Sequence, residues 1–133
     1  MSRYLLDTGI VLRHLRGNRR VVNLLRQLGR TERLSISVIT RLEVYAGMHE
    51  NERQTTQKLL SRFLTYNLDA TIADRSGEFV RQMRSREQAL SMPDAIIAAT
   101  AVQHHLTLIT LNQKDFAGTP GLSLYPLPEG ISS

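Results

Sequence analysis

The apolar residues of this chain gather in short runs, and an acidic residue stands where four of these runs begin or end. Asp7 and Asp115 each follow a strand-like run, whereas Glu43 and Asp94 each stand in the first turn of a helix-like run. An ionised carboxylate is costly beside buried apolar surface unless another group compensates its charge. Four acidic residues at the ends of apolar runs therefore indicate one shared site, and a divalent cation is the natural group to compensate their charge.

The alternation of strand-like and helix-like runs predicts an α/β fold. Apolar spacing predicts helices over 10–15, 21–28, 40–49, 58–64, 72–90 and 93–105. Strands are predicted at 4–6, 34–36, 66–68, 107–111 and 122–125. This order favours a three-layer sandwich, a central parallel sheet with helices on both faces. Ligands bind at the carboxyl ends of the strands in such sheets, so all four acidic residues can gather at one edge.

The 133 residues are expected to form a single domain, residues 1–133, whose core needs no covalent staple. The sequence contains no cysteine, which excludes disulfides and thiolate metal sites and is compatible with a reducing cytoplasm, the expected location. Charged residues interrupt the first apolar run, and no run approaches the ~20 apolar residues of a membrane span. Neither a secretory signal nor a membrane anchor is predicted.

The basic residues of this chain are almost all arginine. Of seventeen Lys and Arg residues only Lys58 and Lys114 are lysine, and the formal net charge is +5. Arginine presents a planar fork that matches phosphate oxygens, which favours a polyanionic partner. A GC-rich genome explains the composition equally well. The positions of two arginines favour the polyanionic partner, because Arg13 and Arg16 follow Asp7 closely. A basic rim beside an acidic centre suits a metal-dependent nuclease.

Each acidic residue also has a purely structural explanation. Glu43 and Asp94 could complete capping boxes with the Thr and Ser three residues before them. Asp7 could cap the next helix, and Asp115 could lie in an ordinary surface turn. The common position of all four at segment borders favours one site over four separate explanations. Ligands of oxygen alone suit Mg²⁺, with Mn²⁺ as a substitute, and not zinc.

At these residues the chain resembles the PIN domain, and in particular the VapC-type ribonuclease toxins of type II toxin–antitoxin systems. The resemblance is carried by the segments 4–9, 37–47, 93–101 and 108–116, which hold the four acidic residues at matching places. Asn112 stands where many family members carry aspartate, and its carbonyl oxygen could still bind directly or through water. The resemblance covers essentially the whole chain.

The resemblance implies a Mg²⁺-dependent endoribonuclease that hydrolyses phosphodiester bonds in structured RNA such as tRNA or rRNA. The four acidic residues would be the catalytic and metal-binding set, with Asp115 at a second ion or acting through water. Thr8, Thr110 and Asn112 would orient the metal-binding carboxylates; a strand-end hydrogen bond explains Thr110 equally well. Arg13 and Arg16 would grip RNA phosphates, although either could be a solvated surface residue.

The resemblance also implies a homodimer and a cognate VapB-type antitoxin, joined as a heterotetramer or larger assembly. The antitoxin's tail would cover the acidic groove, and its docking would use apolar faces of the early helices, for example Val22 and Leu25. Two alternatives remain open: a housekeeping RNA-processing PIN nuclease without antitoxin, and a non-catalytic PIN-fold binding module. A phosphatase is disfavoured because the glycines have no phosphate-loop spacing, and histidine chemistry because the four histidines lack metal-ligand spacing.

Overall fold

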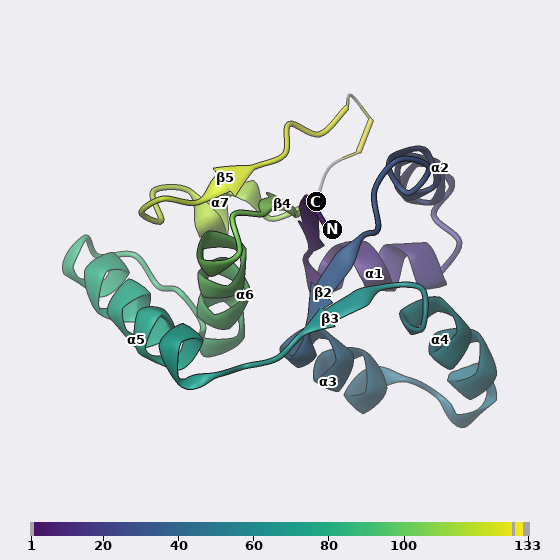
Figure 1. Cartoon of the computed structure of the whole chain (residues 1–133), viewed down its shortest axis with the longest axis horizontal. Helices are drawn as coiled ribbons and strands as arrows, with labels where there is room; N and C mark the ends of the chain where they lie inside the picture. Colours follow the sequence, from purple (N-terminus) through teal and green to yellow (C-terminus); the bar gives the residue numbers. More distant parts are fainter. Residues whose placement is uncertain (1, 129, 132–133) are drawn as a thin grey trace.

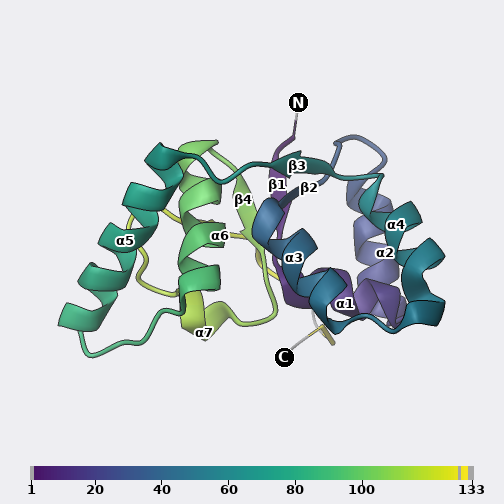
Figure 2. The same cartoon turned by 90° about the horizontal axis from the view of Figure 1, so that it is seen from below.

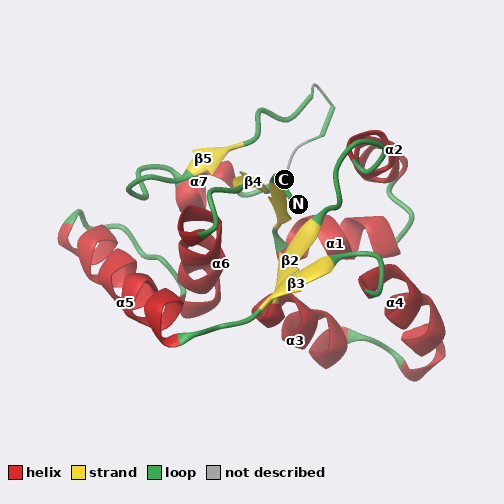
Figure 3. Cartoon of the chain, viewed as in Figure 1, coloured by secondary structure: helices red, strands yellow, loops and turns green. Residues whose placement is uncertain are grey.

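The computed structural model describes residues 2–128 and 130–131. Its centre is a five-stranded parallel sheet in the order β3-β2-β1-β4-β5 (Figures 1 and 3). The strands are β1 (Tyr4–Leu6), β2 (Ser35–Ser37), β3 (Leu64–Tyr66), β4 (Thr107–Ile109) and β5 (Ser123–Leu124). The helices are α1 (Thr8–Leu15), α2 (Arg19–Leu28), α3 (Val38–Gly47), α4 (Arg53–Leu60), α5 (Ala70–Ser85), α6 (Met92–Gln103) and α7 (Gln113–Phe116), with a 3₁₀ turn, η1 (Glu50–Glu52), before α4.

Two apolar cores lie on the two faces of the sheet, because successive strand residues point to opposite faces. Leu6 and Ile109 are buried in a core with residues of α1, α2 and α4. Leu5 and Leu108 are buried in a second core with residues of α5 and α6. Figure 2 shows these two groups of helices on either side of the strands. The predicted three-layer α/β sandwich is confirmed.

The order of the strands creates a switch point between β1 and β4. The chain adds β2 and β3 on one side of β1 and then crosses to place β4 and β5 on the other side. β1 and β4 pair in parallel, with Leu5 opposite Leu108. Connections that leave neighbouring strands in opposite directions open a crevice at the carboxyl ends of those strands. Within the part of the chain that the structure describes, no helix is long and apolar enough to cross a membrane.

The predicted helix over 72–90 is wrong at its end, because α5 ends at Ser85. The amide of Gln88 donates to the carbonyl of Met83 at 2.9 Å, and Glu87 takes a left-handed conformation with φ 59°. This is the Schellman arrangement, in which the residue in the left-handed conformation is usually glycine. A glutamate at that position gives the sequence no sign that the helix ends there.

The middle of the chain also differs from the prediction. The helix predicted over 58–64 exists but its bounds are wrong, because α4 spans Arg53–Leu60 and Leu64 opens β3. The extended piece predicted at 66–68 therefore lies two residues too late. In α4 the buried residues are Thr56, Leu59 and Leu60, so a threonine completes the buried face. A pattern read from apolar residues alone misses that first turn.

The short helix α7 was not predicted, and two side chains fix it. Phe116 is buried in the second core with 1% of its surface exposed. The Gln113 Nε2 group donates to the carbonyls of Thr110 and Tyr125 at 3.3 and 3.0 Å. A four-residue helix is unstable by itself, so these contacts determine where Asp115 lies.

We expect Phe116→Ala to lower the free energy of unfolding by about 3–5 kcal/mol, because it leaves a cavity in the second core. The neighbouring exposed substitution Lys114→Ala should stay within about 0.5 kcal/mol of the wild type. Urea unfolding of the three proteins measures both differences. Equal effects of the two substitutions would contradict the role of Phe116 as the anchor of α7.

Candidate active site

Asp7 lies at the switch point, directly after β1, and both of its carboxylate oxygens accept hydrogen bonds. The Thr8 amide donates to Oδ1 at 2.8 Å, so Asp7 caps α1. The Thr110 hydroxyl, at the end of β4, donates to Oδ2 at 2.6 Å. The Asp7 amide in turn donates to the carbonyl of Ile109 at 2.9 Å. These contacts hold the carboxylate between the two strand ends with 4% of the residue exposed.

Glu43 projects from α3 toward the same strand end. The Thr8 hydroxyl donates to Glu43 Oε1 at 2.7 Å, and it lies 3.0 Å from the Thr40 hydroxyl. The capping box considered for Thr40 and Glu43 is wrong, because α3 begins at Val38 with Ser37 as its cap. Thr40 and Glu43 therefore lie inside the helix, and the hydroxyl that positions Glu43 comes from α1.

Asp94 and Asp115 complete the acidic group from the side of α6 and α7. Asp94 stands in the first turn of α6, where its amide donates to the capping Ser91 hydroxyl at 3.2 Å. The Ser91 cap that the sequence suggested is thus present. Asp94 is half-buried and Asp115, on α7, is exposed. Both line the same hollow at the border of α5, α6 and α7.

The electrostatics of the four carboxylates show that the structure brings them together. Burial raises the pKa of Asp94 to about 6, with further contributions from the charges of Asp7, Asp115 and Glu43. Burial also raises the pKa of Asp7, and the charges of Glu43 and Asp115 add to this, although the hydrogen bonds from Thr110 and Thr8 oppose it. The group is a cluster of like charges held near one another in partly buried surroundings.

As placed, these side chains do not form a finished metal site. Among residues 2–128 and 130–131, no group of three His, Cys, Asp or Glu residues is arranged so that it could hold a metal ion. The donors nevertheless fit a hard divalent cation, because they are carboxylate oxygens whose charges are unfavourable without a positive partner. A bound cation would have to draw the half-buried Asp94 and the exposed Asp115 toward the fixed Asp7 and Glu43.

The remaining predicted site residues are distributed unevenly. The hydroxyls of Thr8 and Thr110 contact carboxylates, whereas Asn112 contributes a backbone amide that donates to the Thr110 hydroxyl at 3.0 Å. Arg13 lies in the last turn of α1 and Arg16 at its end. The eight-residue helix separates its two ends by about 12 Å, so Arg16 stands away from Asp7. Thr40, which the sequence presented as a cap, is the site residue that pattern reading missed.

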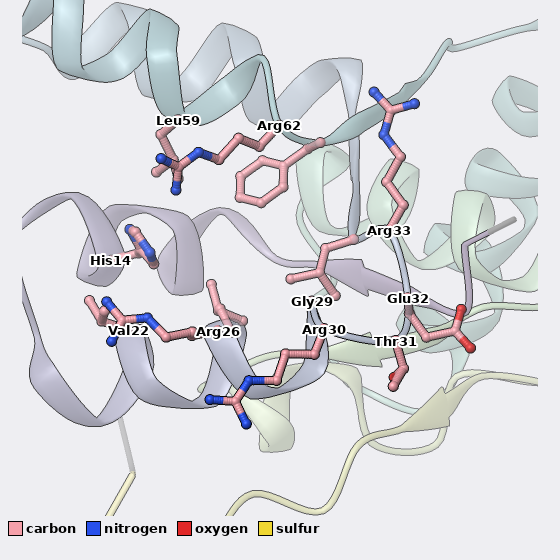
Figure 4. A pocket seen from close by; sticks show the side chains of 13 residues that line it. His14, Val22, Arg26, Gly29, Arg30, Thr31, Glu32, Arg33, Leu59 and Arg62 are labelled. Atoms are coloured by element: carbon pink, nitrogen blue, oxygen red, sulfur yellow. The ribbon is translucent and has the colours of Figure 1, made fainter.

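A second hollow, of about 740 Å³, lies on the other face of the sheet among α1, α2, α4 and the segment 29–34 that leads into β2. We call it the arginine groove. Its lining includes the apolar Val22, Leu25, Leu34, Leu59 and Phe63, together with Arg26, Arg30, Arg33 and Arg62. Figure 4 shows His14 between Arg26 and Arg62, and burial together with these two charges lowers the pKa of His14. The groove is apolar inside and strongly positive at its rim.

Comparisons with known proteins match this chain over most of its length. The family model for the PIN domain matches residues 4–122. Ribonuclease VapC10 of Mycobacterium tuberculosis is 33% identical over 108 residues, which cover 81% of either chain. A toxin–antitoxin complex from Klebsiella pneumoniae contains a chain that is 37% identical, with a TM-score of 0.75 and coverage of 93% of this chain and 99% of that one. A chain of VapBC2 from Rickettsia felis, bound to promoter DNA, shares the fold at a TM-score of 0.81 and 24% identity, covering 94% and 98%.

The raised pKa of Asp94 predicts how the stability of the metal-free protein depends on pH. Between the ordinary value of 3.8 and the value of about 6, the folded state keeps a proton that the unfolded chain has released. The free energy of unfolding should therefore fall as the pH rises through this window and stay lowered above it. Asp94→Asn removes this loss, so its stability relative to the wild type should increase between about pH 4 and pH 7.

Urea unfolding in EDTA at these two pH values measures the change. Asp74→Asn, which alters an exposed acidic residue of α5, serves as the matched control and should show no such dependence. A difference between Asp94→Asn and wild type that is independent of pH would contradict the charge interaction at Asp94.

Proposed function

The chain belongs to the PIN-domain family, and from this premise we propose that it is the endoribonuclease toxin of a VapBC-type toxin–antitoxin pair. The observation that carries the proposal is the group of four mutually repelling carboxylates at the switch point of the sheet. Its substrate would be structured RNA, such as tRNA or rRNA, and the reaction a metal-assisted hydrolysis of the phosphodiester bond. The cytoplasm, where such RNA lies, is the proposed location.

Asp7, Glu43 and Asp94 would hold the principal divalent cation, Mg²⁺ or Mn²⁺ in its place, with Asp115 at a second ion or acting through water. When bound, the cation would activate a water molecule and stabilise the charge that develops on the phosphate. The oxygen-only donor set and the raised pKa values of Asp7 and Asp94 support this assignment.

The threonines would keep this acidic set in place. Thr110 fixes one oxygen of Asp7, and its own hydroxyl accepts from the Asn112 amide, so its proton points toward the carboxylate. Thr8 donates to Glu43 and thereby joins the ends of β1 and α3. Such supporting hydrogen bonds set the orientation and basicity of metal ligands. Arg13 and Arg16 would contact RNA phosphates farther along the strand, away from the cut bond.

The alternatives differ in what they require of the acidic cluster. A non-catalytic binding module has no use for an acidic cluster in which burial and neighbouring charges raise the pKa of Asp7 and Asp94, so the cluster favours catalysis. A housekeeping RNA-processing nuclease would need the same cluster but no antitoxin. The arginine groove favours the toxin, because a large apolar hollow with a charged rim is suited to a protein segment.

The proposed partner is a VapB-type antitoxin whose apolar side chains enter the arginine groove and whose acidic side chains meet its rim. Val22 and Leu25, named from the sequence as docking residues, both line this groove. Four arginines surround it against one lining acid, Glu32, so the charge complements an acidic segment. A homodimer of the toxin, joined with antitoxin in a heterotetramer or larger complex, completes the proposal.

We expect Asp94→Asn to abolish cleavage, because the change removes a proposed ligand charge while leaving the fold intact. Purified protein, freed of any antitoxin, should cut total cellular RNA into discrete fragments with Mg²⁺ and not with excess EDTA. The exposed Asp74→Asn variant should cut like the wild type. Sequencing of the fragment ends identifies the RNA and the bond. Cleavage by Asp94→Asn would overturn the site assignment, and no cleavage by any folded protein would favour the binding module.

The arginine groove gives a separate prediction for the antitoxin. Arg26→Glu should weaken binding by about tenfold or more, because it places a negative charge at the rim of the groove. Arg19→Glu, on the same helix but outside the lining residues, is the matched control. Calorimetric titration with the protein encoded beside this gene measures both affinities. Equal weakening by the two variants would show that net charge, and not the groove, governs binding.

A further inference from the structure

A hollow of about 550 Å³ opens directly beside the acidic cluster, and most of its lining residues have no role in the proposed chemistry. We call it the loop hollow, because the segment between α5 and α6 forms much of its wall. Its lining residues are Val80, Arg84, Glu87, Gln88, Ala89, Leu90, Ser91, Asp94 and Asp115. The volume falls in the range typical of small-ligand sites, and two of the four acidic residues form one side of it. Whatever occupies the loop hollow therefore lies next to the bond that is cut.

The wall of the loop hollow is preformed. The Schellman end of α5, with Glu87 at φ 59°, fixes the direction in which the loop leaves the helix. The Arg86 Nη1 group donates to the carbonyl of Gly118 at 2.8 Å and ties the loop to the turn after α7. Leu90 anchors the other end of the loop, with 6% of its surface exposed. A wall held at three points loses little conformational freedom when a ligand binds.

The lining residues offer apolar surface together with hydrogen-bonding groups. Val80 and Ala89 provide apolar surface against which a flat ring can lie. Gln88 provides two amide N–H donors and a carbonyl acceptor, and Ser91 provides a hydroxyl. Glu87 adds acceptors. Proteins that read single-stranded RNA hydrogen-bond the edge of an unpaired base and stack its face on an aromatic ring or an arginine guanidinium. In the loop hollow the Arg84 guanidinium is the lining group of that kind.

We propose that the loop hollow binds the unpaired base next to the cut phosphate, and that Gln88 selects this base through its edge. The inference rests on the proposed ribonuclease function and extends it to the sequence that is cut. The preferred base is one with an exocyclic amino group, because Glu87, Gln88 and Ser91 all offer oxygen acceptors at the hollow. Uracil, which has no amino group, is disfavoured. Arg84 stands at the rim, where its charge can meet the phosphate of the bound nucleotide.

The test compares Gln88→Leu with the wild type on an RNA whose single-stranded loop is randomised. Leucine keeps much of the side-chain size and removes both the donors and the acceptor. Gln82→Leu, the same change at an exposed position of α5 outside the hollow, is the matched control. Sequencing of the cut ends gives the relative rate for each base at each position. Thermal unfolding checks that all three proteins are folded.

The wild type should prefer amino-bearing bases at one position beside the cut, by about fivefold or more over uracil. Gln88→Leu should lose that preference at that position and keep the wild-type profile at the other positions of the loop. Gln82→Leu should keep the wild-type profile. Cleavage with the same profile in Gln88→Leu and wild type overturns the base site and leaves the ribonuclease in place. Absence of cleavage by the folded wild type overturns the proposed function and this inference with it.

Discussion

The hydrogen bond from Thr110 to Asp7 is the contact on which the site depends. It joins the ends of β1 and β4, which are separated by about a hundred residues in the chain and by one step in the sheet. Thr110 has no exposed surface and Asp7 almost none, so the carboxylate keeps one orientation. A buried carboxylate that accepts hydrogen bonds from a hydroxyl and a backbone amide is stabilised in its charged form. The hydrogen bond from Thr110 links the ends of β1 and β4, and the one from the Thr8 amide caps α1. The fold and the site therefore depend on the same two hydrogen bonds.

The acidic cluster destabilises the folded protein when its carboxylates are charged. Burial and like charges both raise the pKa of Asp7, and the hydrogen bonds from Thr110 and Thr8 offset only part of this, because the pKa remains above its ordinary value. Asp94 lies at a helix N-terminus, which favours a negative charge, and its pKa still rises to about 6. A fold selected for stability alone would not retain such a group. A bound cation would lower this repulsion, and the stability of the protein would then depend on the ligand that its proposed chemistry needs.

Sequence reasoning found those parts of the structure whose signals are local. The strand β1, the Ser91 cap of α6 and the border positions of the four acidic residues each follow from a few adjacent residues, and the parallel sheet follows from their alternation. What it missed depends on contacts between distant segments. Glu43 was matched with Thr40 by spacing, yet the hydroxyl that donates to it belongs to Thr8, 35 residues earlier. The end of α5 and the helix α7 were missed because Glu87 in a left-handed conformation and the packing of Phe116 leave no local pattern.

The two hollows lie on opposite faces of the sheet. This arrangement separates the proposed binding of the antitoxin from the proposed choice of the RNA base. The arginine groove lies beside the core of α1, α2 and α4, whereas the loop hollow lies beside the core of α5 and α6. The acidic residues lie at the strand ends between them. A partner docked in the groove must therefore extend over the sheet edge before it can cover the carboxylates. Its affinity can then be set largely by groove contacts, while the choice of RNA base is set by residues that the groove does not touch. Substitutions in the two hollows should have independent effects, because among the described residues the hollows have no lining residue in common.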